Sequence, residues 1–182
     1  MPNAADDVRL MEARYGRLHN ISMAVLAIGM AAIAVFFLAR GSPQGIASGS
    51  GDPRFMLYLV LVVAMAFYAW LGYSRFANRE PQLVIDHDGI VLGFGRNRRF
   101  RWNEIQWVRV RRLGFRPQLQ IGVAPEAFVA ADLRLSTWSL DDGLRPVRGT
   151  PAAVAVRDNG LDTRTSAMFD AVKSFRPNLV RP

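Results

Sequence analysis

Asp86, His87 and Asp88 follow one another directly and offer two carboxylates and an imidazole, which are common metal ligands. Neighbouring residues on a strand point to opposite faces, so the two carboxylates could converge while His87 points away from them. Gly89 comes next, and this combination is typical of a turn between two strands. We therefore interpret the group as a turn with a solvated histidine, and we expect no metal and no cofactor.

The other groups of reactive residue types do not form a recognisable catalytic site. Asp141–Gly143 is a second turn signature and lacks the spacing of a calcium-binding EF-hand loop. Gly93–Gly95 has neither the third glycine nor the helix of a dinucleotide-binding fingerprint. Ser48 is not part of a Gly-x-Ser-x-Gly motif, and His19 has no paired carboxylate nearby. The lack of cysteine excludes disulfides and thiol chemistry, and we expect a protein that is not an enzyme.

Arginine is the residue type whose clustering points to a function. The formal charge is +8 with Lys173 as the only lysine, and sixteen basic and ten acidic residues lie from Pro81 onward. Guanidinium groups bind phosphate bidentately, so a basic hairpin over 96–101 could contact anionic lipid headgroups. The candidate contact residues are Arg96, Arg98, Arg99, Arg101, Arg109 and Arg111, and the same basic stretch includes Arg112 and Arg116.

Three interpretations of these arginines stay open. They form a solvated sheet face and help to set membrane orientation, they touch an anionic lipid surface without specificity, or they build a specific headgroup pocket. Nucleic acid is not an expected partner, because no DNA- or RNA-binding motif accompanies the basic strands.

Two apolar stretches determine where these residues lie in the cell. Asn20–Ala39 and Phe55–Ser74 each have 20 residues and contain no Asp, Glu, Lys or Arg. A helix of that length spans roughly 30 Å, about one hydrocarbon core. The first stretch is longer than the apolar part of a signal peptide and follows a mixed-charge segment, so we expect it to be retained. The sequence therefore predicts a membrane hairpin with a short Gly/Ser loop over 40–54.

The distribution of arginine predicts the orientation of this hairpin. Basic residues occur in the N-terminal segment 1–19 and again after the second stretch, whereas the loop between Arg40 and Arg54 contains none. Positive residues stay on the cytoplasmic side. We expect a protein of the cytoplasmic (inner) membrane with both termini in the cytoplasm and the loop outside. The membrane spans contain no ionisable residue, which argues against an ion or proton pathway.

After Pro81 the apolar residues alternate with period two, which is typical of strands. We expect six or seven short antiparallel strands over 81–182, including one that contains Leu133 and Leu135, with an irregular segment over 141–150. Pro125–Ala131 is predicted to be a helical turn. Thr165–Arg176 is predicted to be an amphipathic helix that Thr163 or Thr165 caps.

The order of these features resembles bacterial two-helix membrane proteins with a C-terminal pleckstrin-homology-like (PH-like) domain. The resemblance lies in Leu83, Ile85 and Asp86 followed by Gly89-Ile90, then in the Trp102-x-x-Ile105 bend, and in the closing SAMFDAVKSFRP segment. It covers most of 81–182 as well as the hairpin. It implies an antiparallel curled sheet or barrel of about seven strands that a C-terminal helix caps. Such domains mediate assembly more often than they recognise phosphoinositides.

The hypothesis that joins these inferences is a non-enzymatic, membrane-anchored interaction or scaffolding protein. Its PH-like domain would bind a protein partner or further copies of itself at the cytoplasmic membrane face. One alternative is an anionic-phospholipid-binding module that uses the basic hairpin Arg96–Arg101. A second alternative is an auxiliary subunit of a membrane complex.

Overall fold

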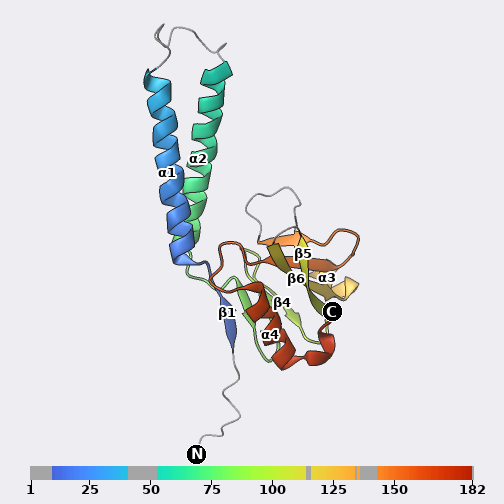
Figure 1. The fold of residues 1–182 in the computed structure, drawn as a ribbon. Coiled ribbons are helices and arrows are strands. Elements are labelled where there is room, and N and C mark those ends of the chain that lie inside the picture. Colours follow the sequence, from blue (N-terminus) through green and yellow to red (C-terminus); the bar gives the residue numbers. More distant parts are fainter. Residues whose placement is uncertain (1–9, 41–52, 114–115, 134, 136–142, 182) are drawn as a thin grey trace, which may run out of the picture. The chain divides into compact units, whose positions relative to one another are not determined.

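The computed structural model describes residues 10–40, 53–113, 116–133, 135 and 143–181, and the chain divides into a helical unit and a β-rich unit (Figure 1). Gly16–Asn78 form the helical unit, while the residues before Gly16 and those from Arg79 onward form the β-rich unit. Residues 41–52 of the predicted loop over 40–54, and Asp141 and Asp142 of the predicted second turn, lie outside the described residues.

The helical unit is the predicted hairpin of two long apolar helices. Helix α1 spans Arg17–Arg40 and helix α2 spans Pro53–Ala77, so both are longer than the charge-free stretches of the sequence. Small residues allow the helices to pack closely. A Cβ atom on Gly72 would lie 2.7 Å from the carbonyl oxygen of Asn20 and 3.0 Å from the Cβ of Ala24. The glycine therefore permits a close approach of the two backbones at this point.

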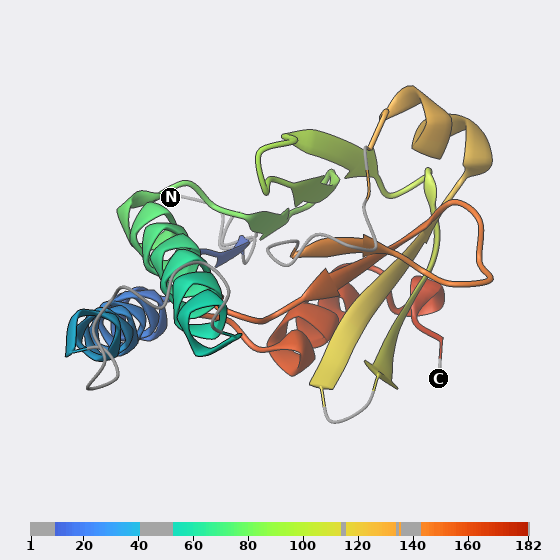
Figure 2. The same ribbon diagram turned by 90° about the horizontal axis from the view of Figure 1, so that it is seen from above.

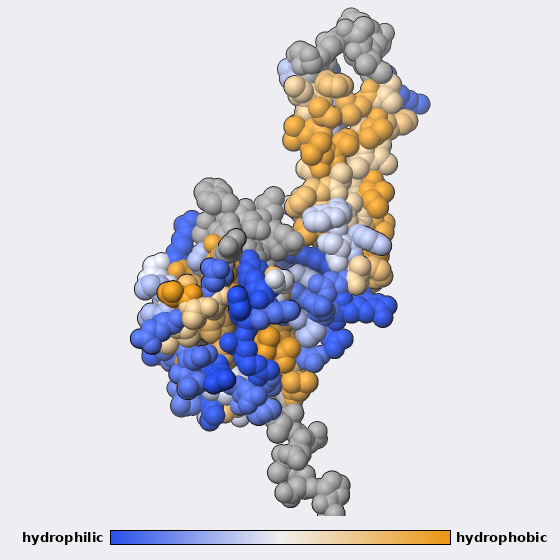
Figure 3. Space-filling model, turned by 180° about the vertical axis from the view of Figure 1, so that it is seen from behind, coloured by the Kyte–Doolittle hydropathy of each residue, from blue (hydrophilic) through white to orange (hydrophobic). Residues whose placement is uncertain are grey.

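The large apolar side chains of both helices face outward. Leu26 and Ile33 of α1 and Val60 and Val63 of α2 are each more than half exposed. The space-filling view shows hydrophobic residues over most of the surface of the helical unit (Figure 3). A soluble helical pair would hide these side chains, so their exposure indicates that lipid surrounds the hairpin.

The first sheet of the β-rich unit has four antiparallel strands in the order β1-β2-β3-β4. These strands are β1 (Met11–Ala13), β2 (Leu83–Ile85), β3 (Gly89–Leu92) and β4 (Arg98–Arg101). Strand β1 was not predicted, because its three residues lie within 1–19, which was expected to be a separate cytoplasmic segment. Ala13 pairs with Leu83, so the chain begins this sheet, leaves it for the hairpin and then returns to its neighbouring position.

The second sheet also has four antiparallel strands, in the order β5-β6-β8-β7. They are β5 (Ile105–Leu113), β6 (Arg116–Val123), β7 (Leu144–Pro146) and β8 (Ala153–Arg157), and the short helix α3 (Pro125–Ala130) follows β6. The strands are antiparallel as predicted, but the prediction that they form one curled sheet or barrel is wrong. The described strands form two separate sheets, because β4 pairs with β3 but not with β5, and no closed barrel results.

Two local predictions are also wrong. Leu133 and Leu135 lie outside any strand, although both side chains contribute to the core. Strand β7 lies within the segment 141–150 that was expected to be irregular. Its three residues are too few to show an alternating pattern, and its pairing with β8 defines it.

The core lies between the sheets and under helix α4 (Thr165–Phe175), which contacts β5 and β6 of one sheet and β2 of the other (Figure 2). Met168 and Val172 of α4 are fully buried, as their helical spacing predicts. Neither Thr163 nor Thr165 caps the helix with its side chain. The carboxylate of Asp158 instead accepts a hydrogen bond from the Thr165 backbone N–H at 3.0 Å. A 3₁₀ turn, Pro177–Leu179, follows the helix.

Candidate functional site

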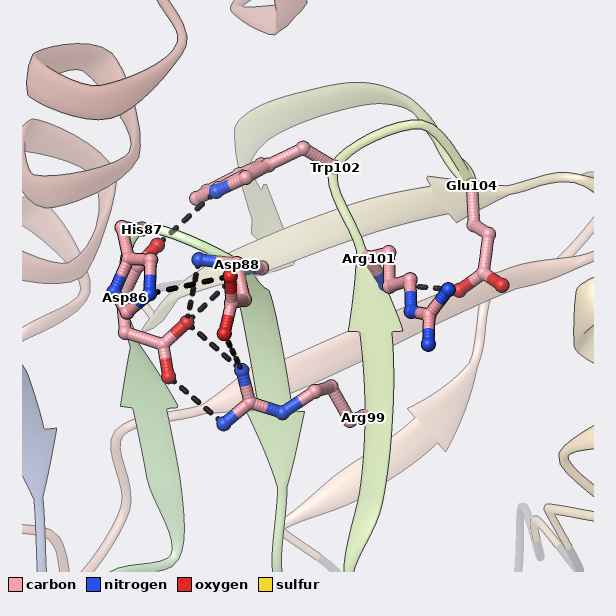
Figure 4. Close-up of polar contacts among 8 residues, drawn as sticks. Asp86, His87, Asp88, Arg99, Arg101, Trp102 and Glu104 are labelled. Carbon is pink, nitrogen blue, oxygen red and sulfur yellow. Dashed lines mark hydrogen bonds and ion pairs between the residues drawn. The ribbon is translucent and has the colours of Figure 1, made fainter.

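The Asp86 side chain holds together the turn between β2 and β3 (Figure 4). Its Oδ1 atom accepts hydrogen bonds from the backbone N–H groups of Asp88 and Gly89 at 2.9 and 3.0 Å. Arg99 of β4 donates to both carboxylate oxygens, at 3.0 Å from Nη1 and 2.9 Å from Nη2. The Asp86 backbone carbonyl accepts a hydrogen bond from the Trp102 indole at 3.0 Å. The predicted turn is confirmed. Hydrogen bonds from Arg99 and Trp102 also connect it to β4 and to the bend that follows β4.

These contacts decide the ionisation of Asp86. Burial alone would raise the pKa of its carboxyl group, but the hydrogen bonds from Arg99 and from the two backbone N–H groups outweigh burial and lower the pKa below its ordinary value. Asp86 is therefore ionised at neutral pH and acts as the anionic partner of Arg99.

His87 and Asp88 complete the group that could hold a metal ion by composition. The ligand atoms of Asp86, His87 and Asp88 lie within 4.8 Å of one another. His87 does not point away from the carboxylates, because its Nε2 atom lies 3.2 Å from Asp88 Oδ1. Arg99 Nη1 also lies 3.4 Å from Asp88 Oδ2. The guanidinium group supplies the positive charge that a cation would bring, so the arrangement favours a structural role.

The structure separates the six candidate arginines into two groups. Arg98, Arg99 and Arg101 belong to β4 and Arg96 to the turn before it, while Arg109 and Arg111 belong to β5 of the second sheet. Arg99 binds Asp86, and Arg96 Nη1 donates to the Phe94 carbonyl oxygen at 3.0 Å. Arg98 and Arg101 are exposed, and Arg99 is exposed as well although its guanidinium group binds Asp86. Arg112 of β5 is also exposed, and the side chain of Arg116 is outside the described part of the chain.

Arg109 has a fixed position on the outer face of the second sheet. Its Nε atom donates to Gln120 Oε1 at 2.9 Å, and its guanidinium carbon lies 4.7 Å from the centre of the Trp107 ring. The Trp107 ring in turn covers Gly122, where an added Cβ atom would lie 2.1 Å from the ring. The side chain of Arg109 thus contacts both the polar Gln120 and the aromatic Trp107 on this face.

Beside Arg109 the outer face of the second sheet is hollowed into a groove of about 490 Å³. We call it the arginine groove. It is lined by Arg111, Gln118, Gln120, Arg145, Pro146, Val147, Arg148 and Arg157. Of the six predicted contact residues, only Arg111 belongs to it. Sequence analysis missed the rest, because Arg145, Arg148 and Arg157 are far from the basic stretch and only the order β5-β6-β8-β7 brings them beside it.

Comparisons with protein-family models, with curated proteins and with solved structures find no match. The exposed apolar helices, the accessible arginines and the arginine groove are the features of this chain that bear on its function.

Proposed function

We propose that this chain is a non-enzymatic, membrane-anchored interaction protein. Helices α1 and α2 span the cytoplasmic membrane, and the β-rich unit lies in the cytoplasm, where it binds a protein partner or further copies of itself. The proposal also assigns a PH-like plan to the β-rich unit. Two antiparallel sheets with a C-terminal helix against strands of both support that plan.

The observation that carries the proposal is the pairing of β1 with β2. Strand β1 precedes the hairpin and β2 follows it, and Met11, Glu12 and Ala13 pair with Ile85, Val84 and Leu83. Two strands that share hydrogen bonds must lie on the same side of a membrane. If lipid surrounds α1 and α2, the chain crosses it twice, and the hairpin anchors the folded domain to the membrane.

Charge supports the cytoplasmic side for that domain. Arg14 and Arg17 lie at the entrance to α1, and Arg75 and Arg79 lie at the exit from α2, which is the arrangement that keeps both ends in the cytoplasm. Cysteine labelling in intact cells tests this orientation, since the natural chain contains no cysteine. A membrane-impermeant maleimide should label Ser48→Cys of the loop and should leave Ser174→Cys of α4 unlabelled until the cells are opened. The reverse pattern contradicts the proposal.

The interaction itself is tested by photocrosslinking in native membranes. We choose position 101, because Arg101 is exposed on β4, and position 129, because Val129 on α3 is 77% exposed. A photoreactive residue at either position should give a protein adduct of discrete mass. The absence of protein adducts at both positions contradicts an interaction role for the β-rich unit.

Anionic-lipid binding is the second candidate, and the exposure of Arg98 and Arg101 favours it. The double variant Arg98→Gln/Arg101→Gln tests it without disturbing Arg99, whose loss would also break the contact with Asp86. Lipid adducts at position 101 together with a lower affinity of this variant for phosphatidylglycerol would support lipid binding. Protein adducts with an unchanged lipid affinity would support the interaction role.

A further inference from the structure

We propose that the arginine groove binds a small anionic ligand that carries phosphate. Four of its eight lining residues are arginines, and none of the lining residues that the structure describes has a carboxylate. Guanidinium groups present paired donors that match phosphate oxygens. The volume of about 490 Å³ lies within the range of small-molecule sites, roughly 300–1,000 Å³.

The register of the sheet places the first pair of arginines on opposite sides of a glutamine. Arg111 of β5 pairs with Gln118 of β6, and Gln118 pairs with Arg157 of β8. The three residues form one row across the sheet and point to the same face. Neighbouring strands are about 4.8 Å apart, so the backbones of the two arginines are roughly 10 Å apart. Long arginine side chains can reach a phosphate group above Gln118 from both sides.

A second row supplies the floor of the groove. Arg109 pairs with Gln120, Gln120 with Ala155, and Ala155 with Arg145. Gln120 is only 2% exposed, and its Oε1 atom is occupied by Arg109, which leaves its NH₂ group as the donor for a ligand. The methyl side chain of Ala155 fills little space between Gln120 and Arg145. The second row therefore gives the groove a buried floor, the amide donor of Gln120 and the guanidinium group of Arg145.

Arg148 adds the fourth cation from a separate segment. It lies in the turn after β7, in which the Thr150 backbone N–H donates to the Val147 carbonyl oxygen at 3.3 Å. Its side chain is exposed, like that of Arg111. Arginines from β5, β7, β8 and this turn thus surround one groove. Arginines that only formed a solvated basic face would not need to converge in this way.

Calorimetric titration of the full chain in neutral detergent tests the site. The probes are pyrophosphate, for a soluble phosphorylated molecule, and glycerophosphoglycerol, for a phospholipid headgroup. Groove variant Arg111→Gln/Arg148→Gln changes two exposed side chains, and Arg164→Gln/Arg176→Gln, which changes two exposed arginines outside the groove, is the control with the same loss of charge. The groove variant should weaken binding about tenfold or more, because it removes two guanidinium groups that can donate charged hydrogen bonds to phosphate, while the control should bind like the natural chain.

The outcomes separate the possible ligands. Groove-dependent binding in which pyrophosphate is the tighter probe supports a soluble phosphate ligand, and tighter glycerophosphoglycerol supports a lipid headgroup. Equal weakening in both variants would mean that only net charge matters and would overturn the proposal. Failure of both probes also overturns it, and groove-dependent binding of hexaglutamate in that case would assign the groove to an acidic protein segment.

A negative result for ligand binding in the groove would not contradict the proposed membrane anchor. Cysteine labelling reports on membrane orientation, and calorimetry of the detergent-solubilised chain reports on the groove alone. A second variant, Arg157→Gln, removes the opposite side of the first row and should reproduce the loss. Unchanged melting temperatures of the variants would show that lost binding does not come from unfolding.

Discussion

Replacing Asp86 by asparagine should destabilise the β-rich unit by about 1.5–2 kcal/mol. Asparagine keeps an oxygen for the N–H groups of Asp88 and Gly89 but loses the negative charge that faces Arg99 and the oxygen that accepts from its Nη2 atom. Hydrogen bonds to charged groups contribute about 1.5–3 kcal/mol each. The Arg99 side chain is 43% exposed, so water compensates for much of the loss, and we take the lower end of the range.

The alanine variant should cost more, because it also removes the acceptor of the two backbone N–H groups. Each of the two lost turn hydrogen bonds adds about 1 kcal/mol, which brings the total for Asp86→Ala to about 3.5–4 kcal/mol. The control is Asp88→Asn, since that carboxylate is 59% exposed and its contact with Arg99 is 3.4 Å long. It should cost about 0.5 kcal/mol or less.

Urea unfolding of the full chain in detergent, followed by tryptophan fluorescence, measures these differences. The double variant Asp86→Asn/Arg99→Gln completes a mutant cycle and should show a coupling energy of about 1–2 kcal/mol. A coupling energy near zero would refute the reasoning, because it would mean that Arg99 does not stabilise the Asp86 carboxylate. Equal stabilities of the asparagine and alanine variants would refute the role of the carboxylate oxygen in the turn.

The same contact predicts a pH dependence. Because folding lowers the pKa of Asp86 below its ordinary value of 3.8, its contribution is complete above that value. It is lost as the pH falls through the lower pKa of the folded state. The natural chain should therefore lose more stability than Asp86→Asn when the pH is lowered from neutral to below 3.8.

Three further substitutions test the packing. Gly122→Ala should lower the stability by about 1–3 kcal/mol, measured by urea unfolding, because its methyl group would overlap the Trp107 ring at 2.1 Å and displace it. Ala13→Asp should destabilise the first sheet by about 3 kcal/mol or more in the same assay, since Ala13 is 0% exposed and an isolated buried charge is costly. Gly72→Leu should separate the two helices, because an added side chain meets the α1 backbone. It should therefore lower the detergent concentration at which the hairpin loses helical circular dichroism. Gly29→Leu should have little effect, since nothing lies within 4 Å of its Cβ position.

Each of these has a control or an outcome that contradicts it. The double variant Gly122→Ala/Trp107→Ala should show no additional loss relative to Trp107→Ala, and an additive loss would mean that the ring does not cover the glycine. Leu10→Asp, at a position that is 56% exposed, should leave stability nearly unchanged. If it is as harmful as Ala13→Asp, the burial of β1 is not the cause. Equal effects at positions 72 and 29 would contradict close packing at Gly72.

Local patterns in the sequence were sufficient to predict the elements whose physical cause is local. Two charge-free stretches of 20 residues predicted the hairpin, since length and apolarity alone decide whether a helix fits a bilayer. Period-two alternation predicted β6 and β8, and the helical spacing of Met168 and Val172 predicted α4. The turn at Asp86 was also predictable, because Asp and Gly favour turns through their own side chain and backbone.

Tertiary structure decided what depends on partners that are distant in the chain. Strand β1 has only three residues and is defined by its pairing with β2, on the far side of the hairpin in sequence. Arg99 was one of several candidate lipid-contact residues, and only the register of β3 and β4 shows that it binds Asp86. The arginine groove depends on the order of four strands, since Arg111 and Arg157 are neighbours of Gln118 only after β6 lies between β5 and β8. Charge and hydropathy are properties of consecutive residues, whereas a binding surface is built from residues that the fold brings together from distant parts of the chain.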